Sequence, residues 1–336
     1  MSDKAWEDML EEFRALGGTA DNICLRNGIY GRGVFPVDPG KPIAIHVPES
    51  LLIDTAHARF ENGQFGVGPD SKATPRERAF VKTYENDFSW GAGGRVETEQ
   101  ILEQAQRLPA QLRETLRSQY RFGDWFEEPT DERVQTQFLD SRCISYRDRT
   151  VLMPILELIN HDSRSRSVRH LDTTNGLSFG GTFSGEVLAR YGDTDAIGAF
   201  ANWGFASEQP QAFSIALKSE SDPVTIGRDL ASLSQKTQYW VPKVQRKSGE
   251  VALQFLMMGN ARYPRMCKGI FYKLMRDAGI ADIEETFDRI QHTNLLFATN
   301  LLSLVEAAEG AMADTLRRVA RFQLQALSNC FGARAL

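Results

Sequence analysis

Three short motifs in this sequence combine residue types that can bind a ligand or do chemistry. Gly31-Arg32-Gly33 lies between two strand-like runs, and glycines there allow a tight turn and a close approach of the backbone to a ligand. Asn160-His161 directly follows the apolar run 151–159 and adds an amide and an imidazole. Tyr191-Gly192 precedes Trp203-Gly204-Phe205 by twelve residues, counted from the tyrosine to the tryptophan. Each motif could contribute to a ligand site.

Taken one at a time, these motifs have simpler structural explanations. A lone GxG is typical of a hairpin turn, and this one lacks the third glycine of a dinucleotide fingerprint and does not continue as a P-loop. Neighbouring residues of a strand point to opposite faces, so His161 and Asp162 cannot form a catalytic dyad. Asn160-His161 by itself therefore favours a structural hydrogen-bonding role. The two aromatic–glycine pairs favour core aromatics beside turns.

The order of the motifs along the chain is more specific than any one of them. Ser141-Arg142 comes before the stretch 154–161, which is PILELINH, and the stretch 185–192 is GEVLARYG. With Gly31-Arg32-Gly33 before them and Trp203-Gly204-Phe205 after them, these segments resemble the SET-domain methyltransferases. Within that family they resemble the class typified by the Rubisco large-subunit lysine methyltransferase. The family patterns are P-x-x-[DE]-L-x-N-H, G-E-x-V/L-x-x-x-Y-G and a closing Y-G-F, and the resemblance covers roughly residues 23–207.

This resemblance implies a fold, a cofactor and a set of site residues. The fold is α+β, with a β-rich SET-type domain that carries a helical insertion and is followed by a mostly helical domain. The cofactor is S-adenosylmethionine (SAM), with S-adenosylhomocysteine as its product, and Tyr191 matches the family's catalytic tyrosine. The residues expected to bind the cofactor are Tyr30, Gly31, Arg32, Gly33, Arg142, Asn160, His161 and Tyr191. The residues expected on the substrate side are Ser141, Glu157, Trp203 and Phe205.

The resemblance also assigns roles within the cofactor pocket. Tyr30 and Arg32 would offer backbone groups, and Arg142 would approach the carboxylate of SAM. Asn160 and His161 would hold its amino end and adenine. The methyl group would pass to a lysine that enters through a narrow channel from the opposite face, and no metal is required.

We therefore expect a SAM-dependent N-methyltransferase that acts on a lysine of a non-histone protein. Histone-type relatives carry a cysteine-rich zinc segment, which this sequence lacks. Trp203 stands where the family usually has a tyrosine, and an indole cannot supply a phenolic oxygen. The acceptor could instead be a histidine, a peptide N-terminus or a small molecule, and a catalytically silent SET-like module that binds a basic peptide is a further alternative. Glu157 is either the family's acidic residue near the lysine or a surface salt-bridge partner.

Hydrophobic periodicity predicts the elements that position these motifs. The run 151–159 contains Pro154, which central strands reject, so a short strand passing into another element is expected there. Pro75 and Glu77 mark a helix start. The other expected strands are 23–26, 43–46, 177–183 and 186–191. The expected helices are 6–16, a helix from 75, 97–108, 109–120, 228–240, 249–259, 267–278, 283–291, 294–308 and 311–327.

The charge distribution suggests two domains. The chain has 336 residues, and residues 1–208 carry a net charge of −9 whereas residues 209–336 carry +4. We expect a SET-like catalytic domain at 1–208, with its helical insertion at about 56–140, and a helical domain at 209–336 that recruits the substrate protein.

The overall composition limits the partners. A net charge of −5 argues against a dedicated nucleic-acid binder. No run of about 18 apolar residues occurs, so no membrane span is expected, and the N-terminus lacks the pattern of a signal peptide. Scattered cysteines without CxxC pairs predict free thiols, no metal site and a cytoplasmic protein. The expected partner is a protein that presents a lysine, and the sequence leaves the oligomeric state open.

Overall fold

The computed structural model describes residues 3–119, 122–170, 175–192, 194–212, 224–226, 243–247, 250–254, 259–260 and 263–331. The chain divides into two compact units. The first comprises Met1–Glu99 and Thr130–Tyr191, and the second comprises Gln100–Pro129 and Gly192–Leu336. Helices and strands occur in both units, which confirms the predicted α+β class.

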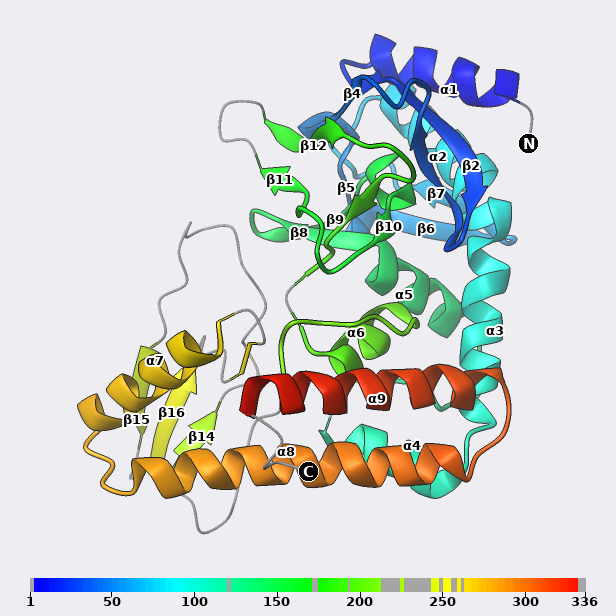
Figure 1. Cartoon of the computed structure of the whole chain (residues 1–336). Coiled ribbons are helices and arrows are strands. Elements are labelled where there is room, and N and C mark those ends of the chain that lie inside the picture. The colour runs from blue at the N-terminus through cyan, green and yellow to red at the C-terminus, as the bar shows by residue number, and fades with distance from the viewer. Residues whose placement is uncertain are drawn as a thin grey trace. The chain divides into compact units, whose positions relative to one another are not determined.

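The first unit is built around an antiparallel sheet with the strand order β1-β4-β12-β11 (Figure 1). The alternation of β4 explains its place, because Ile43, Ile45 and Val47 are buried while the residues between them are more exposed. The predicted strands at 43–46 and 177–183 are thus confirmed. The strands of this sheet are β1 (Thr19–Asp21), β4 (Pro42–Pro48), β11 (Arg169–His170) and β12 (Gly176–Thr182).

The GxG motif lies on a β-hairpin, as the sequence predicts. Strand β2 (Ile23–Gly28) pairs antiparallel with β3 (Gly31–Pro36), and Gly28 is paired with Gly31 across the turn. Gly31 has a φ of +89°, a conformation that favours glycine. The amide of Val187 donates to the carbonyl of Val34 at 2.8 Å, so the hairpin is tied to the chain just before Tyr191.

Helices α1 and α2 pack aromatic side chains together in the first unit. Trp6 of α1 lies 5.4 Å from Phe88 of α2 between ring centroids, and Phe13 lies 5.9 Å from Phe80. Helix α2 begins at Pro75, as predicted, because Thr74 and Glu77 form a reciprocal capping box. The helices of residues 1–142 are α1 (Asp3–Ala15), α2 (Pro75–Phe88), α3 (Arg95–Gln106), α4 (Ala110–Gln119) and α5 (Asp131–Arg142), of which α4 and most of α3 belong to the second unit.

Short elements complete the first unit. The prediction that a short strand at 151–159 passes into another element is confirmed, because β9 stops at Leu152 before Pro154 and a 3-10 turn follows. Within the expected helical insertion, residues 58–67 form a hairpin instead of a helix. The remaining strands are β5 (Ile53–Asp54), β6 (Ala58–Glu61), β7 (Gln64–Val67), β8 (Cys143–Tyr146), β9 (Arg149–Leu152), β10 (Asn160–His161) and β13 (Leu188–Ala189). The short helical turns are η1 (Glu49–Leu51), η2 (Thr55–His57), η3 (Trp90–Gly94) and η4 (Leu156–Leu158).

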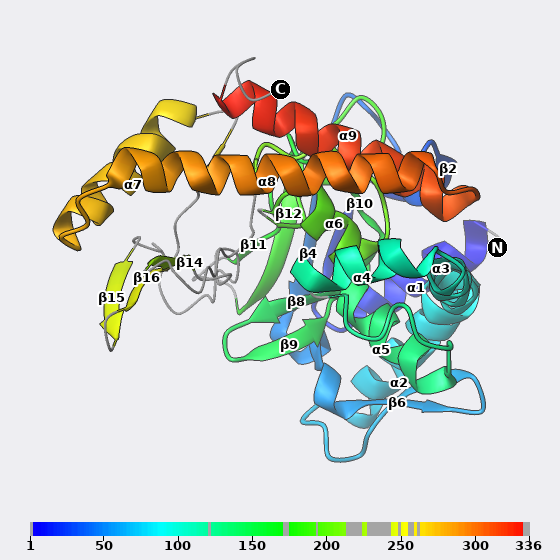
Figure 2. The same ribbon diagram turned by 90° about the horizontal axis from the view of Figure 1, so that it is seen from below.

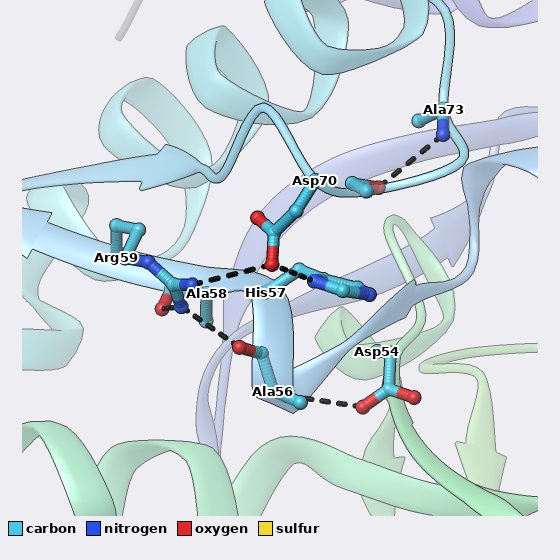
Figure 3. A network of polar contacts seen from close by, with 8 residues as sticks. Asp54, Ala56, His57, Ala58, Arg59, Asp70 and Ala73 are labelled. Atoms are coloured by element: carbon cyan, nitrogen blue, oxygen red, sulfur yellow. Dashed lines mark hydrogen bonds and ion pairs between the residues drawn. The ribbon is translucent and has the colours of Figure 1, made fainter.

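A network of polar contacts holds the segment between β5 and β6 (Figure 3). The Asp54 carboxylate accepts a hydrogen bond from the amide of Ala56 at 3.0 Å. The Asp70 carboxylate lies 3.1 Å from His57 Nδ1 and 3.7 Å from Arg59 Nη2. Because Asp70 and Arg59 are exposed, we assign this network to the local fold of the segment.

The second unit is mostly helical. Helices α8 and α9 run side by side (Figures 1 and 2), and Phe271, Phe287 and Leu327 meet in a buried core. The helices expected at 283–291 and 294–308 are one helix, because no glycine or proline separates them. The helices of this part are α6 (Ala196–Trp203), α7 (Pro264–Asp277), α8 (Ile283–Glu306) and α9 (Ala311–Phe331).

A small sheet in the second unit corrects one prediction. The helix expected at 249–259 is wrong, because β16 (Glu250–Gln254) is a strand that pairs with β14 (Val224–Ile226) and β15 (Lys243–Lys247). The five residues of β16, EVALQ, are too few for their periodicity to distinguish a strand from a helix, and pairing on both sides stabilises the strand. The helix expected at 228–240 lies outside the described residues.

The compact units do not divide the chain at residue 208. They divide it between Tyr191 and Gly192, and residues 100–129 of the expected insertion belong with the second unit. A catalytic role for 1–208 and a substrate-recruiting role for 209–336 remain predictions. Within the described ranges, no helix is both long and apolar enough to cross a membrane.

The capping box at α2 leads to a stability prediction. Thr74→Ala removes the side-chain oxygen that accepts from the amide of Glu77, and it should lower the free energy of unfolding by about 1 kcal/mol. Urea unfolding followed by circular dichroism measures the change. Thr74→Ser keeps the hydroxyl and is the control. Equal stability of Thr74→Ala and wild type would contradict the role of this cap.

Candidate functional site

The side-chain amide of Asn160 joins three of the predicted motifs within the first unit. Its Nδ2 donates to the carbonyl of Arg32 at 3.2 Å and to Glu186 Oε1 at 2.6 Å. Asn160 is positioned by strand β10, which pairs in parallel with β13, and Asn160 lies opposite Leu188. The GxG hairpin, the Asn-His pair and the segment leading to Tyr191 are therefore brought together, as the resemblance implies.

Two glycines of the hairpin are required by the close approach of these groups. A Cβ atom on Gly33 would lie 2.4 Å from Glu186 Oε1 and 2.7 Å from Asn160 Nδ2. A Cβ atom on Gly28 would lie 2.4 Å from Glu186 Oε2. All three distances are shorter than the contacts that real Cβ atoms make, so the two glycines leave space for the Glu186 carboxylate. Sequence reasoning did not single out Glu186, although it belongs to the G-E dipeptide of the motif 185–192.

Tyr191 is held by its backbone and by its hydroxyl. Its hydroxyl donates to the carbonyl of Ile159 at 2.6 Å, and its amide donates to His161 Nδ1 at 3.2 Å. The two rings lie 5.0 Å apart between centroids. Burial raises the pKa of Tyr191, the nearby positive charge of Arg142 lowers it less, and the phenol stays protonated at neutral pH.

His161 is a neutral imidazole in this arrangement. Burial lowers its pKa to about 4, although the neighbouring Asp162 carboxylate acts in the opposite direction. Its Nδ1 accepts the hydrogen bond from the Tyr191 amide, which assigns the ring proton to Nε2. A neutral ring with this tautomer fixes the backbone at Tyr191, and a further hydrogen bond joins the ring to the backbone of Ala189.

The turn that leads into the Asn-His pair is strained. Ile155 has φ +70° and ψ −46°, and the amide of Leu156 donates to the carbonyl of Pro154 at 2.9 Å across it. This is the geometry of a tight γ-turn, which is costly for a β-branched residue. Strained backbone of this kind is typical of functional sites. Ile155 is fully buried, and its packing stabilises the turn.

Glu157 is buried, which excludes the surface salt-bridge alternative for this residue. Its side chain is 6% exposed, and its Oε1 accepts from the Tyr84 hydroxyl at 3.0 Å. Burial raises its pKa, whereas the Arg142 guanidinium acts to lower it. Burial also raises the pKa of a second carboxyl, that of Glu85, and the nearby charge of Glu157 raises it further.

Tyr84 and Glu85 are site residues that sequence reasoning missed. Both lie on the buried stripe of α2, and Glu85 is completely buried. The signal in the sequence is a glutamate at helical spacing with Phe80, Val81 and Phe88. A charged residue on an apolar stripe is unusual, because charged side chains are rarely buried without a partner, and it indicates a polar site at this end of α2.

The other residues predicted to bind the cofactor, and Ser141 of the predicted substrate side, lie on different elements of the first unit. Tyr30 is more than half exposed at the tip of the hairpin, and the Arg32 side chain donates to the carbonyl of Phe88 at 2.5 Å. Arg142 ends α5, stacks over Phe138 at 5.0 Å and is 3.9 Å from the exposed Glu97. The Ser141 hydroxyl donates to the carbonyl of Phe138 at 2.9 Å within the same helix.

Trp203 and Phe205 belong to the second unit. Their rings stack at 6.0 Å with an interplanar angle of 14°, next to the left-handed Gly204 that ends α6. A Cβ atom on Gly192 would lie 3.5 Å from the Trp203 ring. Their role on the substrate side stays a prediction.

The four cysteines are free thiols. Across the described residues, no group of three or more His, Cys, Asp or Glu side chains is arranged to hold a metal ion. Burial raises the pKa of Cys143, and the nearby charges of Glu157 and Glu85 raise it further. This thiol is therefore unreactive at neutral pH.

Comparison with solved structures gives matches, whereas comparison with family models and curated sequences gives none. The chain is similar to a crystal structure of the SET domain of LSMT bound to lysine and AdoHcy, with a TM-score of 0.41 and 14% sequence identity. The match covers 97% of this chain and 90% of that one. A similarity at this level does not establish a common fold, so the functional argument rests on the residues of this chain.

The tight packing at Gly33 predicts the effect of a single methyl group. Gly33→Ala should displace the Glu186 carboxylate and the Asn160 amide, and it should lower the melting temperature by several degrees, equivalent to about 1–3 kcal/mol. Gly185→Ala is a matched control, because no atom lies within 4 Å of the added Cβ there. Thermal unfolding measures both. A neutral Gly33→Ala variant would contradict the described contacts.

The low pKa of His161 predicts a dependence of stability on pH. The unfolded state binds the proton at about pH 6.5 and the folded state at about 4, so stability is lost as pH falls from 6.5 towards 4. The loss from this residue should reach about 3 kcal/mol. In His161→Gln, which keeps an acceptor for the Tyr191 amide, this part of the loss should vanish. Urea unfolding at several pH values tests it, and parallel curves for the two proteins would refute it.

Proposed function

We propose that this protein is a SAM-dependent N-methyltransferase of the SET type that methylates a lysine of a non-histone protein. The observation that supports it most is the Asn160 amide, which bridges the Arg32 carbonyl and Glu186. It joins three motifs that are far apart in the sequence. The same motifs define the cofactor pocket in the family that the sequence resembles.

The residues present fit the chemistry of SAM. Arg142 is a cation with a buried Nε that has no hydrogen-bond partner among the described residues, which suits a carboxylate ligand. The hairpin tip at Tyr30 and Gly31 has exposed backbone, and the neutral His161 and Asn160 supply polar groups. These residues, with Arg32, Gly33 and Tyr191, would hold the cofactor. When bound, SAM supplies an electrophilic methyl group on a positive sulfonium.

Tyr191 orients the reacting groups and does not act as a base. Its raised pKa keeps the hydroxyl protonated, and that hydroxyl donates to the Ile159 carbonyl. The lone pairs of the phenolic oxygen remain available for weak C–H···O contacts. Most of the rate gain in such a site comes from position.

The substrate amine must lose a proton before it can attack. For a free lysine this costs about 4.6 kcal/mol at pH 7, from its pKa near 10.4. An apolar channel lowers that pKa by disfavouring the charged form. Ser141, Glu157, Trp203 and Phe205 are the residues proposed to lie on the substrate side.

Trp203, which stands where the family usually has a tyrosine, is the reason to test methyl acceptors other than lysine. A tryptophan cannot donate or accept as a phenol does, although its face attracts cations. Peptides that present lysine, histidine or a free N-terminus, tested in parallel with labelled SAM, distinguish these acceptors. Transfer to lysine supports the proposal, whereas transfer to histidine or an N-terminus favours the alternative enzyme.

Cofactor binding is the first test. Titration calorimetry with S-adenosylhomocysteine should give micromolar binding that is lost in Asn160→Ala. Asn300→Ala, at an exposed position of α8, is the control and should bind like wild type. Absence of binding to wild type would refute the proposed function and favour the silent binding module.

Substitution of Tyr191 separates binding from turnover. Tyr191→Phe should reduce methyl transfer by about 100-fold or more while the affinity for S-adenosylhomocysteine changes little, because only the hydroxyl is removed. Tyr146→Phe, which loses a hydroxyl that contacts Glu49 at 3.4 Å, is the matched control and should stay active. Full activity of Tyr191→Phe would show that the hydroxyl has no role in catalysis.

A further inference from the structure

Buried polar atoms without partners are concentrated at one place in the first unit. In the described residues, eleven buried side-chain nitrogen or oxygen atoms have no hydrogen-bond partner. Six of them belong to a cluster at the C-terminal end of α2. They are Arg32 Nε, Glu85 Oε1 and Oε2, Ser89 Oγ, Arg142 Nε and Glu157 Oε2.

The cluster contains two carboxyls in an interior position. Glu85 is completely buried and Glu157 is 6% exposed, and three of their four oxygens have no partner. Two ionised carboxylates in such surroundings are very costly, because each loses its hydration and they repel one another. Against the dominant effect of burial, Ser89 acts to lower the pKa of both carboxyls, and the backbone of Trp90 acts to lower that of Glu85. These groups do not form regular hydrogen bonds to the three oxygens, and a hydroxyl donates a single proton.

The positive charge around the pair is limited. Arg142 is the cation that acts most strongly on both glutamates, yet it forms no direct ion pair with either in the described part of the chain. Arg32 acts more weakly on Glu157, it is not among the groups that shift the pKa of Glu85, and its guanidinium is directed to the carbonyl of Phe88. One negative charge on the pair of carboxyls therefore balances the single positive charge of Arg142, whereas two negative charges would leave one without a counter-charge.

We propose that Glu85 and Glu157 hold one proton between them, and that the single negative charge that remains is the counter-charge of Arg142. Glu85 is then a positioning residue. It sets how much positive charge Arg142 offers to the carboxylate of a ligand. The second part rests on the proposed function, because it assumes that Arg142 meets the carboxylate of SAM.

The charged and titratable groups around the pair come from several elements. Tyr84 lies on α2 with Glu85, and burial keeps its phenol protonated. The groups on the other elements are Arg32 on β3, Asp140 and Arg142 on α5, Cys143 on β8 and Tyr191 after β13. Asp140 is the comparison for any measurement, because burial raises its pKa as well.

Infrared spectroscopy tests the shared proton without any ligand. At pH 7 the wild-type protein should show the C=O absorption of a neutral, buried carboxyl. Glu85→Gln and Glu157→Gln should each lose that absorption, because the glutamate that remains takes the negative charge. Asp140→Asn should keep it. Absence of the band in wild type, or its survival in either glutamine variant, would overturn the proposal.

Ligand affinity tests the effect on Arg142. Wherever the infrared band is present, Glu85→Gln should bind S-adenosylhomocysteine within about twofold of wild type, because an amide resembles the protonated carboxyl. At a higher pH at which the wild-type protein has lost the band, wild type should bind S-adenosylhomocysteine about fivefold or more weakly than Glu85→Gln does. If the band persists at every pH at which the protein is folded, the two affinities should stay equal throughout. 5′-Methylthioadenosine lacks the carboxylate, so its affinity should not differ between the two proteins.

The outcomes separate this inference from the proposed function. Failure of wild type to bind S-adenosylhomocysteine refutes the proposed function, and the infrared result still decides the shared proton. Binding of S-adenosylhomocysteine with affinities that diverge while the band is present overturns the role of Glu85. Equal affinities after the band has disappeared overturn it as well.

Discussion

The bridge made by the Asn160 amide is the interaction on which the arrangement of the candidate site depends. One nitrogen donates to the Arg32 carbonyl and to the Glu186 carboxylate, and so it ties the hairpin β2–β3 to the segment before Tyr191. The absence of a side chain at Gly33 makes this possible. A carboxylate that accepts from an amide in a partly buried position gains more than it would in water. The positions of His161 and Tyr191 follow, because both residues continue from the paired strands β10 and β13.

The C-terminal end of α2 is a second place in the first unit where polar side chains from several elements come together. It brings Tyr84 and Glu85 to Glu157, and its last carbonyls receive the Arg32 side chain. The hairpin, the strained turn at Ile155 and the end of α5 therefore all meet one helix end. A polar interior of this kind costs stability compared with an apolar one. Under the proposed function, a polar interior at this place serves the binding of a charged ligand.

Local signals made part of this structure predictable from the sequence. Pro75 with the capping residues gave the start of α2, and the two glycines gave the hairpin. The burial of Glu157 and the presence of Glu85 beside it depend on tertiary packing, and a glutamate on a helix looks like surface charge until its neighbours are known. The strand β16 was missed because its five residues, EVALQ, are too few to show a decisive period, although its antiparallel partner β15 ends only three residues before it. The motif order predicted that the GxG hairpin, Asn160 and the segment before Tyr191 lie together in the first unit.

The pairing of β10 with β13 also has a consequence for how the site is formed. The two strands are parallel and only two residues long, and residues 162–187 lie between them. A parallel pair needs such a crossover, and closing it costs entropy that four paired residues return only in part. The loop contains β12, whose long register with β4 can form first and hold the ends close together. The candidate site is therefore expected to assemble late in folding, after the central sheet, and to open in local fluctuations that leave that sheet intact.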